Sequence, residues 1–141
     1  MTEKNVVQLN NEQIREELKN AKTIAIIGLS SKPDRPSYGV AKYLQNAGYK
    51  IYPVNPVETE VLGEKSYPDL KSLPSVPDIV DVFRKSETVM AVVDECLEIG
   101  AKFVWFQLGV VNLEAVERCN QEGVKVVFDK CIKIEHRELG L

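Results

Sequence analysis

A glycine followed by a serine-rich, basic loop is the part of this chain best suited to binding an anion. Residues 28–37 (GLSSKPDRPS) follow an apolar, β-branched run at 23–28 and lead into a helical pattern that begins near Val40. Backbone N–H groups of such a loop, together with the positive end of a helix dipole, favour a bound phosphate. The pattern therefore predicts a nucleotide-type ligand.

Basic side chains also follow another apolar run, at 78–83. Arg84 and Lys85 come directly after it, and ligands of open α/β sheets bind beyond the carboxyl ends of the strands. With Lys32 and Arg35 they could neutralise a phosphate-rich ligand, arginine through a bidentate fork and lysine as a point charge. We prefer a solvated surface position for the two lysines and ligand binding for the two arginines.

Two common nucleotide-binding motifs are absent. A dinucleotide-binding turn would read Gly-x-Gly-x-x-Gly, and an acidic residue would close the second strand. Here the turn has Gly28 alone and the second strand ends in Val54-Asn55-Pro56, which counts against NAD. No Gly-Lys-Ser/Thr occurs in the chain, which counts against a P-loop ATPase or GTPase.

Few residues are candidates for catalysis. Cys131 follows the last predicted strand beside Lys130, where its thiol could react or form a mixed disulfide with a thiol ligand. We prefer a packing role for it. His136, the single histidine, could act as a base near Cys131 with Asp129 as its orienting partner, but we prefer a surface position. The sequence therefore predicts no catalytic residue.

The other cysteines and the large aromatic residues fit a protein core. Cys96 and Cys119 lie on the apolar stripes of predicted helices, and Trp105 and Phe106 lie in the middle of a predicted strand. The three cysteines are odd in number and form no Cys-x-x-Cys pair. This usage predicts a reduced, cytoplasmic protein without a metal site.

Composition excludes two classes of partner. The chain has 141 residues, 28% of them charged, and a net charge of −3 without a long basic block, so we expect no nucleic-acid binding. No apolar run approaches the roughly 20 residues that cross a bilayer, and the first residues do not resemble a signal peptide. We therefore expect no membrane partner.

The elements that must position these residues alternate along the chain. Apolar runs predict strands at 23–28, 49–54, 78–83, 102–106 and 124–128, and stripes at helical spacing predict helices at 11–19, 40–47, 86–99 and 112–121. This alternation predicts one α/β domain over residues 1–141, with 1–9 flexible. We expect a Rossmann-like three-layer sandwich whose five-stranded parallel sheet has the order 3-2-1-4-5 and helices on both faces.

One stretch lacks such a pattern. Residues 57–77 contain Gly63 and three prolines and predict an irregular segment, with one helical turn near 69–72. The segment is longer than a usual connection, so we expect a lid over the ligand or a contact surface.

Short motifs occur along residues 10–138 in a recognisable order. They are IIGLS at 26–30, PDRPS at 33–37, YPVNP at 52–56, VLGE at 61–64, YP at 67–68, DVFR at 81–84, WFQLG at 105–109 and DKCIK at 129–133. Their combination resembles the small bacterial and archaeal CoA-binding domain proteins. A more distant resemblance is to the N-terminal domain of the alpha subunit of succinyl-CoA synthetase.

This resemblance implies a fold that binds coenzyme A or an acyl-CoA across the strand ends. By this analogy residues 28–37 line the nucleotide-phosphate end, 54–56 flank the adenosine, and 83–84 with 107–109 follow the pantetheine arm. The candidate cofactor-binding residues are Gly28, Leu29, Ser30, Ser31, Lys32, Arg35, Ser37, Val54, Asn55, Pro56, Phe83, Arg84, Lys85, Gln107, Leu108 and Gly109.

The chain departs from the synthetase subunit in two ways. The subunit has lysines after its Val-Asn-Pro, placed for the 3′-phosphate, whereas Val57-Glu58-Thr59-Glu60 follows here. Arg35, Lys32 or the Arg84–Lys85 pair would have to take that role. The second domain, with its phosphorylated histidine, is absent, so ligase activity does not carry over.

We therefore expect a cytoplasmic CoA- or acyl-CoA-binding module without catalysis, serving in sensing, storage or delivery. Two alternatives stay open: an enzyme that acts on a CoA thioester with Cys131 participating, and a nicotinamide-dinucleotide-binding redox sensor. The sequence identifies no protein partner.

Overall fold

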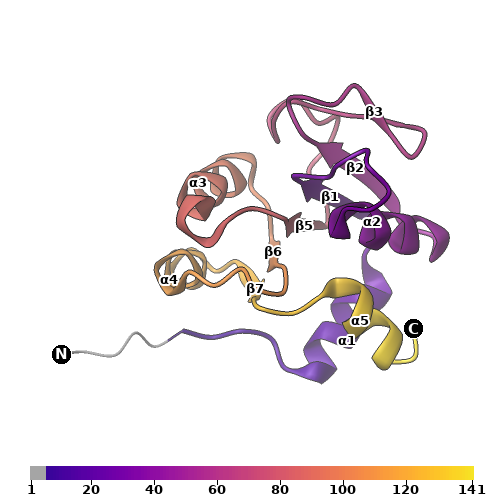
Figure 1. The fold of residues 1–141 in the computed structure, drawn as a ribbon. Helices are drawn as coiled ribbons and strands as arrows, with labels where there is room; N and C mark the ends of the chain where they lie inside the picture. The colour runs from indigo at the N-terminus through magenta and orange to yellow at the C-terminus, as the bar shows by residue number, and fades with distance from the viewer. Residues whose placement is uncertain (1–5) are drawn as a thin grey trace.

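A computed structural model describes residues 6–141, in which strands and helices alternate (Figure 1). Their bounds are α1 (Asn11–Asn20), β1 (Thr23–Ile27), α2 (Pro36–Asn46), β2 (Lys50–Val54), β3 (Glu60–Val61), β4 (Glu64–Lys65), β5 (Ile79–Val82), the 3₁₀ turn η1 (Ser86–Thr88), α3 (Val89–Ile99), β6 (Phe103–Phe106), α4 (Leu113–Gln121), β7 (Lys125–Val127) and α5 (Ile132–Glu138). The predicted strands are confirmed, whereas α2 begins at Pro36 rather than near Val40, because proline suits the first turn of a helix.

Five parallel strands form the main sheet in the order β2-β1-β5-β6-β7. The Rossmann-like α/β class and the parallel sheet are confirmed, but the predicted order 3-2-1-4-5 is wrong. The third long strand, β5, pairs with β1 instead of lying outside β2. Ile27 is in register with both Val54 and Val82, so the carboxyl ends of β1, β2 and β5 lie level.

This order places the reversal of the chain at β1. Since β2 lies on one side of β1 and β5 on the other, the connection leaving β1 leads to α2 on one face and the connection leaving β5 leads to α3 on the other face. In sheets of this order, ligands bind at the carboxyl ends of these two strands. The connection from β2 to β5 is the segment 57–77, which crosses without a helix.

The segment 57–77 is more ordered than its sequence predicts. It contains the antiparallel hairpin β3–β4, and Tyr67 forms a parallel bridge with Val54 at the end of β2. The helical turn predicted near 69–72 is instead a turn in which the Ser72 N–H donates to Asp69 Oδ1 at 2.9 Å. The hairpin therefore extends the β2 side of the molecule (Figure 1).

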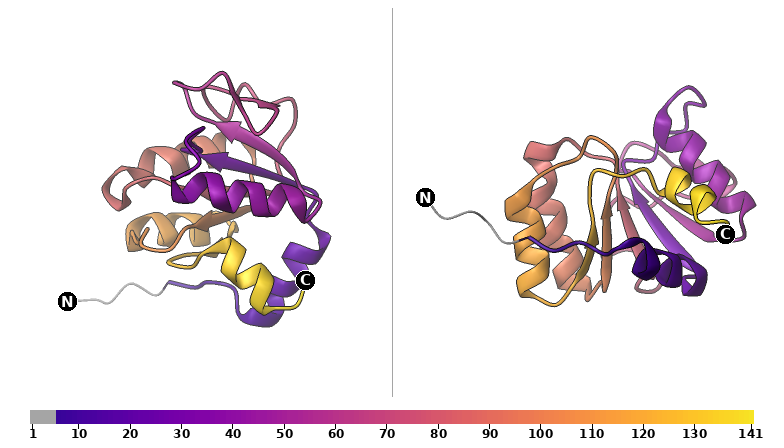
Figure 2. Two further views of the ribbon diagram at one scale, coloured as in Figure 1. Left: turned by 45° about the vertical axis from the view of Figure 1, so that its right-hand side comes forward. Right: turned by 90° about the horizontal axis from the view of Figure 1, so that it is seen from below.

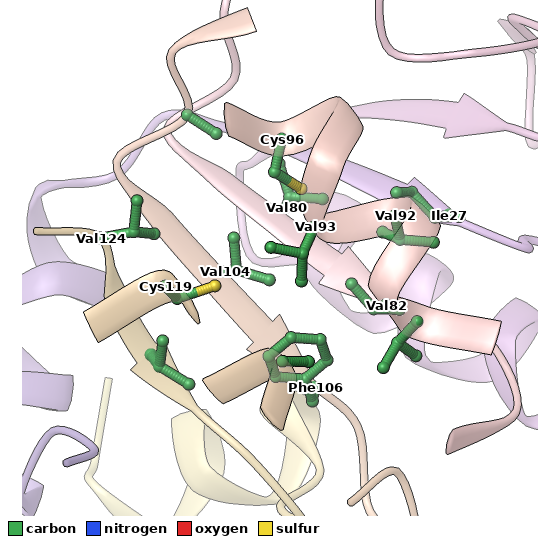
Figure 3. Close-up of a cluster of buried hydrophobic side chains, with 14 of the residues drawn as sticks. Ile27, Val80, Val82, Val92, Val93, Cys96, Val104, Phe106, Cys119 and Val124 are labelled. Carbon is green, nitrogen blue, oxygen red and sulfur yellow. The ribbon is translucent and has the colours of Figure 1, made fainter. Parts of the chain in front are cut away.

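Helices cover both faces of the sheet (Figure 2). Alternate strand residues supply two separate cores: Ile24 and Ile26 pack with α1, α2 and α5, whereas Ala25 and Ile27 pack with α3 and α4. Figure 3 shows part of the second core, in which Cys96 and Cys119 lie among Val80, Val104 and Phe106. Trp105 is fully buried in the first core. The predicted packing roles of these cysteines and aromatic residues are confirmed.

The C-terminal residues form a helix that the sequence patterns did not reveal. His136 lies on α5 and is 6% exposed, and its Nδ1 forms a 2.8 Å hydrogen bond with the Tyr43 hydroxyl. Its ring also meets Tyr43 and Tyr49 edge-on. The predicted surface position of His136 is wrong, because α5 packs its ring against tyrosines of α2 and the start of β2.

The N-terminal segment runs beside β7. The Leu9 N–H donates to the Val126 carbonyl at 2.9 Å, and the Gln8 side chain accepts from the Phe128 N–H at 3.1 Å. Flexibility was predicted for residues 1–9, of which 1–5 lie outside the described residues. Among the residues that the structure describes, no helix is long and apolar enough to cross a membrane.

Candidate functional site

The end of β1 lies in close contact with the end of β5. Gly28 has φ +85°, and a Cβ at this position would lie 2.2 Å from the Phe83 carbonyl oxygen. The Gly28 N–H also donates to the Val54 carbonyl at 2.8 Å. Because only glycine accepts both this φ and this approach, Gly28 lets the chain leave the sheet between β2 and β5.

The loop after Gly28 is held by its own polar groups. The Ser30 N–H donates to Ser37 Oγ, and the Lys32 N–H donates to Ser30 Oγ, both at 3.1 Å. Ser37 is 5% exposed in the first turn of α2, and Leu29 is fully buried in the core. Leu29 and Ser37 therefore hold the loop in place, and the loop itself meets solvent at Ser31 and Lys32.

A cleft of about 390 Å³ opens beside this loop at the carboxyl edge. It is lined by Gly28, Ser30, Lys32, Arg35, Pro36, Ser37, Asn55, Val57, Glu58 and Phe83. Most of these residues are ones that the sequence places in the phosphate and adenosine regions. The structure thus brings the ends of β1, β2 and β5 together around one hollow.

Asn55 has a positioning role in this cleft. Its Nδ2 donates to the Leu29 carbonyl at 3.0 Å, and its Oδ1 accepts from the Val57 N–H at 3.1 Å. The Asn55 carbonyl accepts from the Ser66 hydroxyl at 3.1 Å. Asn55 therefore ties the β1 loop to the hairpin segment. Val54 beside it is buried in the sheet, and Pro56 is exposed.

Positive charge lies on both sides of Gly28. Lys32 and Arg35 are exposed on the loop, whereas Arg84 is half-buried at the end of β5. A Cβ on Gly28 would lie 3.1 Å from Arg84 Nη1, so the guanidinium covers the glycine. Arg84 forms no ion pair with any of residues 6–141, and Lys85 is exposed. An unpaired, half-buried guanidinium at a strand end suits an anionic ligand.

Glu58 lines the cleft, although the sequence pattern does not predict it as a site residue. Its Oε2 accepts from the Ser31 backbone N–H at 2.6 Å. Hydrogen bonds from the Ser31 backbone and side chain, and the nearby charge of Lys32, hold the pKa of Glu58 below its usual value. The only sequence signal was the acidic stretch at 57–60, which does not reveal that the carboxylate reaches the β1 loop.

Gln107 is buried rather than open to the edge. Its Nε2 donates to Asp81 Oδ1 at 2.5 Å, and both side chains are buried. Burial raises the pKa of Asp81 to about 8, and Asp81 Oδ2 has no partner among residues 6–141. Leu108 is 65% exposed, and Gly109 donates its N–H to Asp129 Oδ1 at 2.8 Å. Of the three predicted pantetheine contacts on this segment, the two exposed ones are Leu108 and Gly109.

The three candidate catalytic residues do not form hydrogen bonds with one another. Cys131 is half-buried at the start of α5, Asp129 accepts from Gly109, and His136 bonds with Tyr43. No hydrogen bond links the three side chains. Residues 6–141 also contain no group of three His, Cys, Asp or Glu side chains placed to hold a metal ion.

Known proteins are similar to this chain in sequence and in fold. A model of the CoA binding domain matches residues 22–137. The uncharacterized protein YneT of Bacillus subtilis is 46% identical over 124 residues, which cover 88% of this chain and 92% of YneT. A hypothetical protein from Pyrococcus horikoshii has a solved structure that superposes with a TM-score of 0.90 at 41% identity, covering 99% of both chains.

A larger protein contains a matching region. The alpha subunit of ADP-forming acetate–CoA ligase II from Pyrococcus furiosus is 30% identical over 139 residues. The alignment covers 86% of this chain but only 29% of the ligase subunit. The chain therefore corresponds to less than a third of that relative.

Proposed function

This chain belongs to the CoA binding domain family, and we propose that it binds coenzyme A or an acyl-CoA at the carboxyl edge of its sheet. The observation that carries the proposal is the cleft lined by Gly28 and the serine-rich loop. Beside it, the guanidinium of Arg84 lies against Gly28 and has no ion-pair partner among residues 6–141. The name of the acetate–CoA ligase relative supports CoA as the ligand.

We propose that the phosphates lie against the β1 loop and the basic residues around it. The start of α2 supplies partial positive charge, and Lys32, Arg35 and Arg84 supply full charges. The adenosine would lie near residues 54–57. The pantetheine arm would then run past Phe83 toward Leu108 and Gly109, where the side chain of Leu108 is exposed.

We further propose that binding is the whole function, in sensing, storage or delivery of the ligand in the cytoplasm. The separate hydrogen-bond partners of Asp129 and His136 support a role without catalysis, since neither contacts Cys131 through a hydrogen bond. The alternative enzyme rests on Cys131, which is half-buried and begins the helix after β7.

Titration calorimetry of the reduced, ligand-free protein with CoA, 3′-dephospho-CoA and NAD tests the ligand. We expect CoA to bind at micromolar concentration or below, and more tightly than NAD. Weaker binding of 3′-dephospho-CoA would assign the 3′-phosphate to the basic residues. If CoA does not bind, the proposal is wrong, and tighter binding of NAD would favour the redox sensor.

Two variants locate the site. Arg84→Gln removes a charged hydrogen-bond donor and should weaken CoA binding by about 10-fold or more. Lys102→Gln removes the same charge from an exposed position just before β6, at the opposite edge of the sheet, and should leave affinity unchanged. Equal affinity of the two variants would remove Arg84 from the site.

A third variant separates module from enzyme. Cys131→Ser should leave CoA affinity unchanged if the thiol only packs in the structure. If the unaltered protein hydrolyses a CoA thioester and Cys131→Ser does not, the result would instead favour an enzyme in which Cys131 takes part.

A further inference from the structure

The loop at 28–37, to which we assign the ligand phosphates, already binds a carboxylate of the protein itself. Glu58 Oε2 accepts the Ser31 backbone N–H at 2.6 Å, a short hydrogen bond to an ionised acceptor. Glu58 lies half-buried in the wall of the cleft that also contains Lys32 and Arg35. A carboxylate thus occupies a donor of the same loop that we assign to phosphate.

The contact is built by the turn after β2. Asn55 accepts the Val57 N–H through its side chain at 3.1 Å and the Glu58 N–H through its carbonyl at 3.3 Å. Since Asn55 also donates to the Leu29 carbonyl, this turn is fastened to the β1 loop. Glu58 therefore projects toward Ser31 from a fixed backbone.

Its chemistry resembles that of a phosphate oxygen. Both groups are anionic acceptors of a backbone N–H, and the lowered pKa of Glu58 keeps its carboxylate ionised at neutral pH. A ligand phosphate that reached Ser31 would have to displace this carboxylate, and a phosphate bound nearby would be repelled by it.

Resting on the proposed function, we infer that Glu58 is a specificity-determining residue that competes with ligand phosphate for the Ser31 N–H. In the free protein it holds the loop in its binding conformation. On binding it gives up the N–H, so it lowers affinity for ligands whose phosphate approaches Ser31. It thereby selects against excess negative charge at this end of the cleft.

An acidic side chain near the second strand could act differently, by accepting a ribose hydroxyl, as in dinucleotide-binding domains. The two roles predict opposite effects of neutralisation. A competitor that loses its charge tightens phosphate binding, whereas a ribose acceptor that loses its charge weakens nucleotide binding. The existing bond to the loop N–H favours the competitor.

The test compares Glu58→Gln with Glu60→Gln in calorimetric titrations with CoA and 3′-dephospho-CoA. Glutamine keeps a neutral acceptor for Ser31, so the turn is preserved. Glu60 is exposed on the hairpin and forms no ion pair with residues 6–141, so its variant controls for net charge. We expect E58Q to bind CoA about 3- to 10-fold more tightly than E60Q, the gain from removing one charged competitor.

The ligand pair identifies the phosphate. A gain that persists with 3′-dephospho-CoA assigns the competition to the diphosphate, and a gain seen with CoA alone assigns it to the 3′-phosphate. In amide NMR spectra, the Ser31 resonance should shift in E58Q, and CoA should move it in the unaltered protein as the carboxylate is replaced.

Three results would count against the inference. If CoA binds the unaltered protein and E58Q equally, Glu58 does not compete. Weaker binding of both ligands by E58Q would assign a ribose contact instead. If CoA binds neither protein, the proposed function itself is wrong, and the competition is wrong with it.

Discussion

At the scale of single residues, the most unusual group is the buried carboxyl of Asp81. It lies on β5, is fully buried, and accepts one hydrogen bond, from Gln107, which directly follows the neighbouring strand β6. Burial without a positive partner disfavours the ionised form, which raises the pKa from the ordinary 3.8 to about 8. Asp81 is therefore protonated in the folded protein at neutral pH, and it fixes the buried orientation of Gln107.

This shift makes stability depend on pH. The folded state keeps the proton up to about pH 8, whereas the unfolded chain releases it near pH 3.8. The contribution of Asp81 to the free energy of unfolding is thus fully present below pH 3.8 and is lost as pH rises from 3.8 to about 8. The loss is about 1.4 kcal/mol per pH unit within that window.

Denaturant unfolding of Asp81→Asn at pH 5, 6, 7 and 8 measures this effect, because asparagine keeps the acceptor for Gln107 and cannot ionise. We expect the variant to gain stability relative to the unaltered protein by about 1.4 kcal/mol for each pH unit. A difference between Asp81→Asn and the unaltered protein that does not change with pH would mean that Asp81 is ionised in the fold over this range.

At the scale of elements, the junction between β1 and its loop decides whether the site forms. The strand end lies against the Phe83 carbonyl, and the chain turns there with a positive φ at Gly28. The sequence predicts this glycine to be part of a phosphate-binding loop. The structure adds that its lack of a side chain is needed for strand packing as well.

Gly28→Ala should therefore destabilise the protein by about 2–5 kcal/mol, from left-handed backbone strain and overpacking against β5. Gly123→Ala is the matched control, since Gly123 has φ +73° but no heavy atom within 4 Å of an added Cβ. It should cost only the strain, about 1–2 kcal/mol. Chemical denaturation measures the free energy of unfolding of both variants. Equal losses of stability would show that the Phe83 carbonyl moves away from the added Cβ without a measurable cost.

At the scale of the whole molecule, two cores on opposite faces of the sheet hold the carboxyl edge in place. The face carrying α1, α2 and α5 is closed by His136, which joins α5 to Tyr43 of α2. Burial lowers the pKa of His136 below 6.5, so the folded protein prefers the neutral ring. This contact lies near the start of β2, away from the proposed ligand.

Protonation of His136 should consequently weaken the docking of α5. The unfolded chain binds the proton more readily than the folded chain. The contribution of neutral His136 to folding stability is therefore present above pH 6.5 and is lost as pH falls below 6.5, by at most about 1.4 kcal/mol per pH unit. His136→Gln should remove this acid-side loss. The single histidine gives one imidazole C2–H signal in NMR, and a midpoint at or above 6.5 would contradict the burial effect.

The sequence by itself determined the class of the fold, the five strands, the loop at 28–37 and the family resemblance, which the match over residues 22–137 confirms. Those features depend on local patterns: apolar runs, helical spacing and a glycine at a strand end. Such patterns reflect steric preferences and burial within a few residues of each other.

The tertiary structure alone decided the strand order, the burial of His136, the Asp81–Gln107 pair and the reach of Glu58 to Ser31. Each depends on partners far apart in the chain, such as Glu58 and Ser31, 27 positions apart, or His136 and Tyr43, 93 apart. Local periodicity does not say on which side of β1 the third strand inserts. The hydrogen bond from Ser31 to Glu58 likewise depends on how the turn after β2 lies against the loop after β1.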